Sequence, residues 1–303
     1  MADTRSFTGG QFAFMADGSE FLGFVKKVSG GTAKAEVATH NLGPSLLQKK
    51  HISTISFEDI TCEVGLGMAK AMYEWIQATF DQGTVSKSGE IHACNAEGSS
   101  MAVREYRDAL ITEVAMPALD GSSKEPAYMT LKISPEEIKY LPGTGAKIEG
   151  KIAPATKKWL CSNFRIDLGK LPCARVSKID AWTWKAKTTK DEVGQFRIAT
   201  KHVSAVEVPN LKLTISTADI KDWQDWHKSF LIDGNCSETD ELSGSITFLS
   251  PNLKEELGRV ELQNVGMVSM ENEGFEANKE GVSRFTVELY VEQMKFHIEE
   301  SDA

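Results

Sequence analysis

The chain has 303 residues, of which 41% are hydrophobic and 25% are charged, an ordinary balance for a globular protein. Its formal net charge of −9 argues against tight binding of nucleic acid, which usually requires a basic face, but not against a surface that DNA slides past. No apolar run approaches the roughly 18–20 residues of a membrane helix, and the start, MADTRSFTGGQFAF, has no basic stretch before an apolar core, so neither a membrane span nor a secretory signal is expected.

The first half of the chain predicts strands around a single helix. Residues 11–28 predict a hairpin around Asp17-Gly18, a strong turn signal. Residues 36–50 (EVATHNLGPSLLQKK) follow as a long loop, and residues 51–60 (HISTISFEDI) predict a strand because β-branched side chains are frequent there. Residues 67–80 predict a helix from apolar side chains at helical spacing, namely Met68, Met72, Trp75, Ile76 and Phe80.

The second half predicts the same elements in the same order. These are a hairpin over residues 163–179, a strand and helix over 211–230, a strand over 241–249 and a final strand over 283–298. The helix is expected to begin at Ser216 or Thr217, which are good N-cap residues. In the final strand apolar and polar residues alternate, which is typical of a sheet with one buried face.

The two halves align residue by residue. Met129 lies over Phe285, an offset of 156 that continues without a gap to Tyr140 over Phe296. The offset is 155 between Ser88-Gly89 and Ser243-Gly244, and 151 between Trp75 and Trp226. Asp59-Ile60 over Asp219-Ile220 gives 160, which predicts about nine extra residues before the first helix. We therefore expect two tandem, mainly β domains with one helix each, at residues 1–141 and 163–303, with a Gly-, Pro- and Lys-rich linker at 142–162.

This repeated order resembles the tail tube proteins of contractile-tailed phages and related injection systems, a fold shared with the Hcp tube proteins of type VI secretion. The resemblance is carried by FAFMADGSEFLGFVKKVSGG, AMYEWIQATFDQG and NEGFEANKEGVSRFTVELYVEQMKF, and it covers nearly the whole chain, once per half. It implies a structural protein, not an enzyme, that forms stacked rings around a conduit for DNA or effectors. Family members usually have one domain and close rings of six, so a duplicated chain is expected to form a trimeric ring with pseudo-sixfold symmetry.

The resemblance also implies partners and a location. The expected partners are further copies of the chain, a surrounding sheath protein, and baseplate and tail terminator proteins, with DNA only as passing cargo and no cofactor or membrane. The expected location is the virion tail, assembled in the host bacterial cytoplasm. Two alternatives stay open: a baseplate hub or tube initiator that adapts sixfold to threefold symmetry, and a β-barrel module that binds a small ligand.

Two surfaces are candidates for assembly. In the family, the long loop after the first hairpin largely stacks the rings; here exposed leucines among turn residues would form that surface, and the alternative is that the loop folds back on its own domain. Its residues are Leu42, Pro44, Leu46 and Leu47. The polar face of the strands would line the bore, the alternative being an ordinary solvated face. Its candidates are Thr130, Lys132, Thr286 and Glu288.

Motifs for catalysis or metal binding are missing from the sequence. It contains no HExxH, no GxSxG and no complete dinucleotide or phosphate loop, and His92 with Cys94 supplies only two ligands. Trp182 and Trp184 share a strand face and are interpreted as core or interface anchors. The cysteines form no CxxC pair, so free and mostly buried thiols are favoured, with cross-links between subunits as the alternative. They are Cys62, Cys94, Cys161, Cys173 and Cys236.

Overall fold

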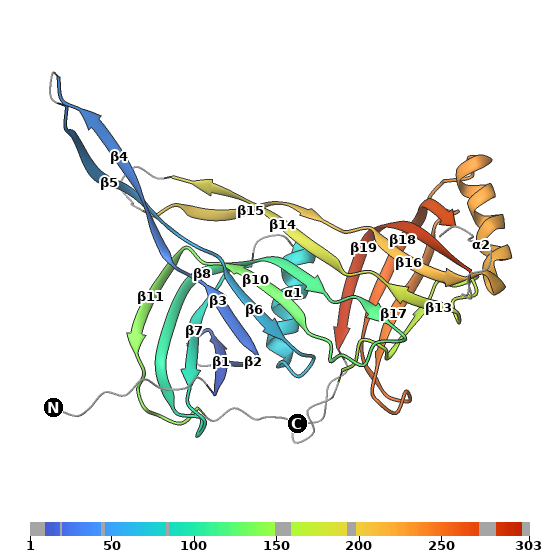
Figure 1. The fold of residues 1–303 in the computed structure, drawn as a ribbon, viewed down its shortest axis with the longest axis horizontal. Helices are drawn as coiled ribbons and strands as arrows, with labels where there is room; N and C mark the ends of the chain where they lie inside the picture. The colour runs from blue at the N-terminus through green and yellow to red at the C-terminus, as the bar shows by residue number, and fades with distance from the viewer. Residues whose placement is uncertain are drawn as a thin grey trace.

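The computed structural model describes residues 10–18, 20–43, 46–82, 85–148, 159–192, 198–272 and 283–298. In this part of the chain the fold is mainly β, with two α-helices and two large sheets that lie next to one another (Figure 1). No helix among the described residues is long and apolar enough to cross a membrane. The fold class therefore agrees with the prediction from strand and helix periodicity.

The larger sheet is built mostly from the first half of the chain. Its strands follow the order β2-β1-β7-β8-β10-β6-β3, with β11 beside β8. Helix α1 (Lys70–Gln82) packs against one face of this sheet. The strands are β1 (Gln11–Ala16), β2 (Glu20–Val25), β3 (Lys27–Gly30), β6 (Ile60–Val64), β7 (Lys87–Cys94), β8 (Ser100–Met116), β10 (Met129–Ser134) and β11 (Glu137–Pro142).

The second sheet has seven strands in the order β12-β17-β18-β19-β16-β13-β9. Its helical segment is continuous: η1 (Thr217–Asp219), α2 (Ile220–His227) and the π-helical turn η2 (Lys228–Ile232). Ser216 begins it as predicted, because its hydroxyl accepts a hydrogen bond from the backbone of Ala218. The strands are β9 (Leu119–Asp120), β12 (Phe164–Asp167), β13 (Val176–Ile179), β16 (Leu211–Ser216), β17 (Leu242–Leu249), β18 (Glu256–Asn272) and β19 (Arg284–Ile298).

A long hairpin leaves each half of the chain. One is β4 (Ala33–Asn41) with β5 (Gln48–Phe57), and the other is β14 (Trp182–Asp191) with β15 (Thr200–Glu207). Both extend toward the same end of the molecule in Figure 1, and β4–β5 projects well beyond the body. The loop expected over residues 36–50 is therefore wrong in form, because β4 and β5 remain paired up to Asn41 and Gln48.

The strands of the two halves pair in the same sequence. The path β1-β7-β8-β10-β6-β3 corresponds place by place to β12-β17-β18-β19-β16-β13. Even an irregularity recurs: β8 bulges at Thr112 against β10, and β18 bulges at Val268 against β19, 156 residues later. Left-handed backbone also recurs at that offset, at Asp108 (φ 45°) and Asn264 (φ 54°).

The alignment of the segment before each helix was wrong. Residues 51–57 belong to β5, and the strand that leads into α1 is β6. Val28 lies opposite Cys62, as Ile179 lies opposite Leu213, so the offset is 151 in these strands as well as in the helices. No nine-residue insertion is present between β3 and α1; the match between Asp59-Ile60 and Asp219-Ile220 was fortuitous.

The core follows the predicted periodicities. In β19 Val287, Leu289 and Val291 are buried, whereas Thr286 and Glu288 are only half-buried. In and before α1 the predicted apolar stripe is buried, with Phe80 half-buried at its end. The hairpin turn is also where it was predicted, because Asp17 and Gly18 both have positive φ angles, 47° and 92°.

Gly89 tests how closely β1 and β7 approach. A Cβ at this position would collide with the backbone oxygen of Met15, which also accepts the Tyr106 hydroxyl at 2.7 Å. Gly89→Ala is therefore expected to lower the free energy of unfolding by about 1–3 kcal/mol, as overpacking typically does. Urea unfolding measures the change. Gly67→Ala is the control, since nothing lies within 4 Å of its Cβ position; an equal loss in both variants would contradict the close approach.

Candidate functional site

The junction between the two halves is a continuous piece of β-sheet. β14 pairs antiparallel with the end of β8, from Trp182 opposite Met116 to Lys185 opposite Glu113. Because β10 occupies the other edge of β8 there, β14 continues along the edge that β7 covers further back. A strand of the second half thus satisfies backbone groups that the first half leaves unpaired.

The exchange between the halves is reciprocal. β9, which follows β8, pairs with β13 in the second sheet, with Leu119 opposite Ile179. The end of the expected linker is also docked at the junction: Ala127 N donates to Trp159 O at 2.9 Å, and Cys161 N donates to Glu125 O at 3.1 Å. Backbone pairing therefore holds each half of the chain to the other on both sides of the junction.

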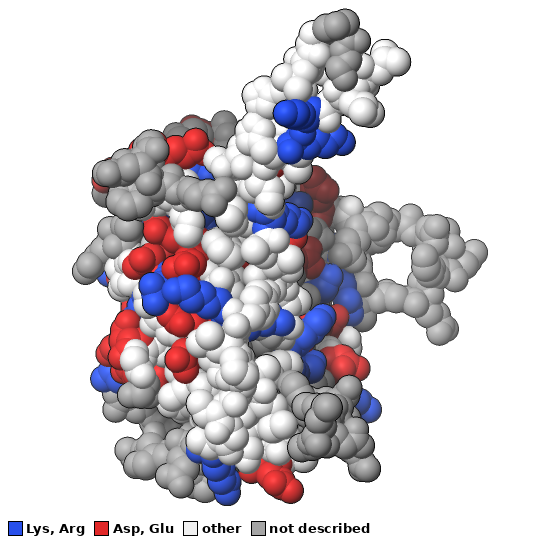
Figure 2. All heavy atoms as spheres, turned by 90° about the vertical axis from the view of Figure 1, so that its left-hand side faces the viewer, with Lys and Arg blue, Asp and Glu red and all other residues white. Residues whose placement is uncertain are grey.

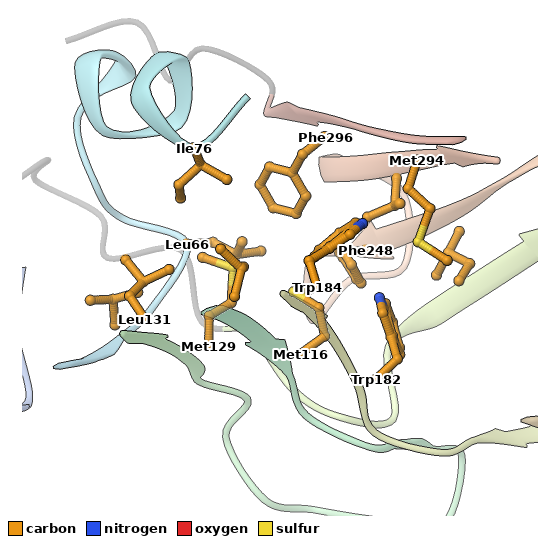
Figure 3. Packing of buried hydrophobic residues seen from close by; sticks show 14 of the residues in the cluster. Leu66, Ile76, Met116, Met129, Leu131, Trp182, Trp184, Phe248, Met294 and Phe296 are labelled. Carbon is orange, nitrogen blue, oxygen red and sulfur yellow. The ribbon is translucent and has the colours of Figure 1, made fainter. Parts of the chain in front are cut away.

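Four aromatic side chains pack across the junction, and we call Tyr73, Phe80, Trp184 and Phe296 the aromatic cluster. Ring centroids are 5.8 Å apart for Phe80 and Trp184, and 5.6 Å for the stacked pair Tyr73 and Phe296. The Phe296 backbone N also donates to Gln77 Oε1 at 2.8 Å. Figure 3 shows Trp184 and Phe296 in the hydrophobic core between the helix and both sheets. Trp182 and Trp184 are each 3% exposed, which confirms them as core and interface anchors.

A lysine fastens the second hairpin to the first sheet. Lys201 Nζ donates to Ser134 Oγ and to Pro135 O, both at 2.8 Å, and its backbone N donates to Glu136 Oε1 at 2.6 Å. Burial lowers the pKa of Lys201, and the nearby carboxylates of Asp59 and Glu136 oppose that shift. The contact places β15 across the corner between β10 and β11.

The candidate bore residues lie on the polar face of the sheets, away from the helices. Thr130, Lys132, Thr286 and Glu288 are all half-buried. Lys132 Nζ lies 3.3 Å from Glu113 Oε1, and Lys212 Nζ lies 3.3 Å from Glu288 Oε2. A hydrogen bond from Asn210, followed by Lys212, lowers the pKa of Glu288. Charges of both signs are thus interspersed and mutually paired on this face.

The leucines expected to stack rings lie at the tip of the β4–β5 hairpin. Leu46 is 101% exposed and Leu47 is 79% exposed, and Leu42 is exposed as well, whereas Pro44 lies outside the described residues. Figure 2 looks at the molecule from this side and shows the hairpin as an arm with basic side chains below its tip, where Lys49 and Lys50 occur in the sequence. The arm presents apolar side chains far from its own core, a geometry that suits contact with another molecule.

The remaining candidates have ordinary surroundings. The thiols of Cys62, Cys94 and Cys161 are buried, and desolvation raises the pKa of Cys62 to about 12. Cys173 is half-buried, which leaves Cys236 as the exposed thiol that another chain could reach. His92 Nδ1 lies 2.9 Å from Ser100 Oγ, and its Nε2 lies 2.8 Å from Glu90. Among the described residues no group of three or more His, Cys, Asp or Glu could hold a metal ion.

Comparison with known proteins identifies a family that the first half of the chain resembles. Residues 10–139 match the model of the family described as T4-like virus tail tube protein gp19. This segment is similar to the tail tube family, and the match covers less than half of the chain. The match spans the larger sheet apart from β14 and β15 and the last residues of β11, together with α1 and the β4–β5 hairpin. No curated protein matches the chain.

Solved structures of low identity also resemble part of this chain. One is a chain of the PVC extracellular contractile injection system, from its sheath–tube complex in the extended state, with 17% identity and a TM-score of 0.41 over 46% of this chain and 95% of that one. Another is from the anti-feeding prophage tube-terminating cap, with 15% identity and 0.40 over 52% and 98%. Hcp1 from Flavobacterium johnsoniae has 11% identity and 0.28 over 46% and 98%. Because these scores are below 0.5, no argument rests on them, and the similarity to the tail tube family rests on the family model.

Sequence reasoning missed most of the junction. It identified Trp182 and Trp184 as anchors from their spacing, but not the strand that they pair with. Lys201 carries no local signal in the sequence, because its neighbours in the hairpin, Thr200 and His202, are exposed polar residues and Lys201 itself is half-buried. The sequence repeat predicts that β8 and β18 are equivalent strands. Nothing in the sequence predicts that β14 pairs with the end of β8.

The aromatic cluster is testable by a double-mutant cycle. Trp184→Ala is expected to lower the free energy of unfolding by about 3–5 kcal/mol, because a large buried side chain is removed. Phe80→Ala should cost less, since Phe80 is half-buried. The double variant should reveal a coupling of about 0.5–1.5 kcal/mol by denaturant unfolding. Strictly additive losses would show that the two rings do not stabilise the junction together.

Proposed function

We propose that this chain is a tail tube subunit of a contractile injection apparatus, in which it polymerises into stacked rings around a conduit. The observation that supports this most directly is the junction of β14 with β8, because it joins two sheets edge to edge within one chain. Repeating such a junction between chains would produce a closed barrel of sheets with no remaining edge. The tail tube family of residues 10–139 supplies the functional class.

We further propose that the chain is a tandem duplication and that its ring is trimeric. The matching strand paths and the bulges at Thr112 and Val268 support the duplication. If each half acts as one tube domain, three chains supply six domains, and the ring has pseudo-sixfold symmetry. On this reading the domains are residues 1–141 and 163–303.

The polar face with Lys132 and Glu288 would line the conduit. Its charges are paired within the face, so they offer a passing polyanion few unneutralised cations to bind. The cargo would be DNA or effector proteins. A sheath outside the tube, a baseplate below and a terminator above are the proposed partners, and the tube would reside in the tail of a virion or related machine.

Negative-stain microscopy of the purified chain, combined with mass measurement of single rings, tests the proposed function. Rings with a central hole and three chains each are expected, because two domains per chain halve the usual subunit number. Rings of six chains would retain the tube and refute the trimer. A monodisperse monomer at high protein concentration would refute the tube.

The hairpin tip should control stacking and not ring closure. The double change Leu46→Asp with Leu47→Asp is expected to leave single rings and to abolish tubes, because charge replaces the exposed apolar contact. Counting tubes and rings by microscopy measures this. Leu253→Asp is the matched control, since Leu253 is also exposed but lies in the turn between β17 and β18. Tubes of normal length from the tip variant would exclude these leucines from stacking.

A further inference from the structure

The contacts that join the two halves inside one chain have counterparts that lie uncovered at opposite ends of the chain. The repeat offset of 156 places β8 residues 113–116 over β18 residues 269–272. The offset of 151 places β14 residues 182–185 over residues 31–34, where β4 begins. The end of β18 is therefore equivalent to the edge of β8 that β14 covers inside the chain.

The end of β18 has the properties of an uncovered edge. β17 pairs with β18 only as far as Val265, and along residues 266–271 no described strand lies on that edge. Val268 is 43% exposed, whereas its counterpart Thr112 is 8% exposed. Met270 is half-buried, and its counterpart Val114 is buried beneath β14. These side chains are more exposed because no described strand covers the end of β18 in the way that β14 covers the end of β8.

The start of β4 has the complementary properties. On its edge away from β5, no described strand pairs with it. Ala33 and Ala35 are exposed, whereas their counterparts Trp184 and Ala186 are buried at the junction. Close by in the first half, Tyr140 is 56% exposed, and its counterpart Phe296 is only 6% exposed.

Charge agrees with the same pairing. The counterpart of Lys201 is Lys50 on the exposed hairpin, and the counterpart of its acceptor Glu136 is Glu292 on β19. Lys50 and Glu292 are both exposed in the single chain. Inside the chain the backbone N of Lys201 donates to Glu136, and the same docking of a second chain would bring Lys50 and Glu292, which carry opposite charges, close together.

We propose that the end of β18 in one chain pairs antiparallel with the start of β4 in a second copy, with Ala33 opposite Met270. This register is the one that places Trp184 opposite Val114 inside the chain. The contact is head-to-tail, so successive copies add in one direction until the ring closes. The inference rests on the proposed ring and names the strands and register that close it.

The contact between chains differs in chemistry from the contact within a chain. At the positions of Trp184, Phe80 and Tyr73 the inter-chain contact has Ala33, Leu231 and Gln224. The fourth position, that of Phe296, keeps an aromatic ring as Tyr140, so the inter-chain contact has one aromatic ring where the junction inside the chain has four. The ring consequently alternates between two kinds of junction, one packed with four aromatic rings and one that combines a single aromatic ring with small, aliphatic and polar side chains.

Disulfide trapping tests the register. Opposite residues in an antiparallel pair have Cα atoms about 4.5–5.5 Å apart, within the range that a disulfide spans. Ala33→Cys and Met270→Cys are combined in a Cys236→Ser background, which removes the exposed native thiol. Oxidation of assembled protein should yield covalent dimers and closed trimers on a non-reducing gel. Two chains that each carry one of the cysteines should yield dimers only when mixed.

The matched control moves one cysteine by a single residue. Ala33→Cys with Glu271→Cys places the thiols on opposite faces of the proposed sheet and should not cross-link. Two outcomes would overturn the inference and leave the proposed ring intact. One is that Ala33→Cys cross-links with Glu271→Cys and not with Met270→Cys; the other is that neither pair cross-links although microscopy shows rings. Absence of rings from the Cys236→Ser parent and the wild type would instead refute the proposed function, so the two failures are distinguishable.

Discussion

The structure depends on the strand edge that β8 presents beyond the end of β7. Backbone N–H and C=O groups in a packed sheet must find partners, and here residues 113–116 find them in β14 from the other half of the chain. That one pairing positions Trp182 and Trp184 over the core and carries the β14–β15 hairpin across the corner where Lys201 binds. The two sheets are consequently held together by backbone pairing, since each half supplies a strand that pairs with the sheet of the other half.

An edge satisfied from outside suits a protein that acts by assembling. A surface built for chemistry needs converging titratable groups, whereas the polar face here carries ion pairs such as Lys132 with Glu113 that neutralise each other. Because these pairs are partly exposed, each contributes little stability, and their main effect is to keep the face hydrated and without a strong field of one sign. In the proposed conduit, a passing polymer would therefore meet a hydrated surface of mixed charge that binds it weakly.

Local periodicity accounts for what the sequence predicted well. The alternation of β19, the stripe of α1 and the turn at Asp17 each depend on neighbours within a few residues, so composition and spacing reveal them. The assignment of residues 51–60 failed because β5 and β6 have similar β-branched composition, and only pairing distinguishes them. The β4–β5 hairpin was taken for a loop because its turn residues and leucines interrupt the alternation. The docking of β14 on β8 leaves no periodic trace, since it joins segments about 70 residues apart.

If the two halves arose by the proposed duplication, they are free to differ, and the aromatic cluster lies where they do. A tethered junction already benefits from the high effective concentration of its partner, so it needs less interaction energy than a junction between separate chains. Yet the larger aromatic contacts, Phe80 with Trp184 and Tyr73 with Phe296, lie in the tethered junction. Their most direct consequence is rigidity, because they hold the two halves of the chain at a fixed angle. In the proposed ring, a chain already held at the correct angle would lose less conformational entropy on closure, so the contact between chains could be built from residues as small as Ala33.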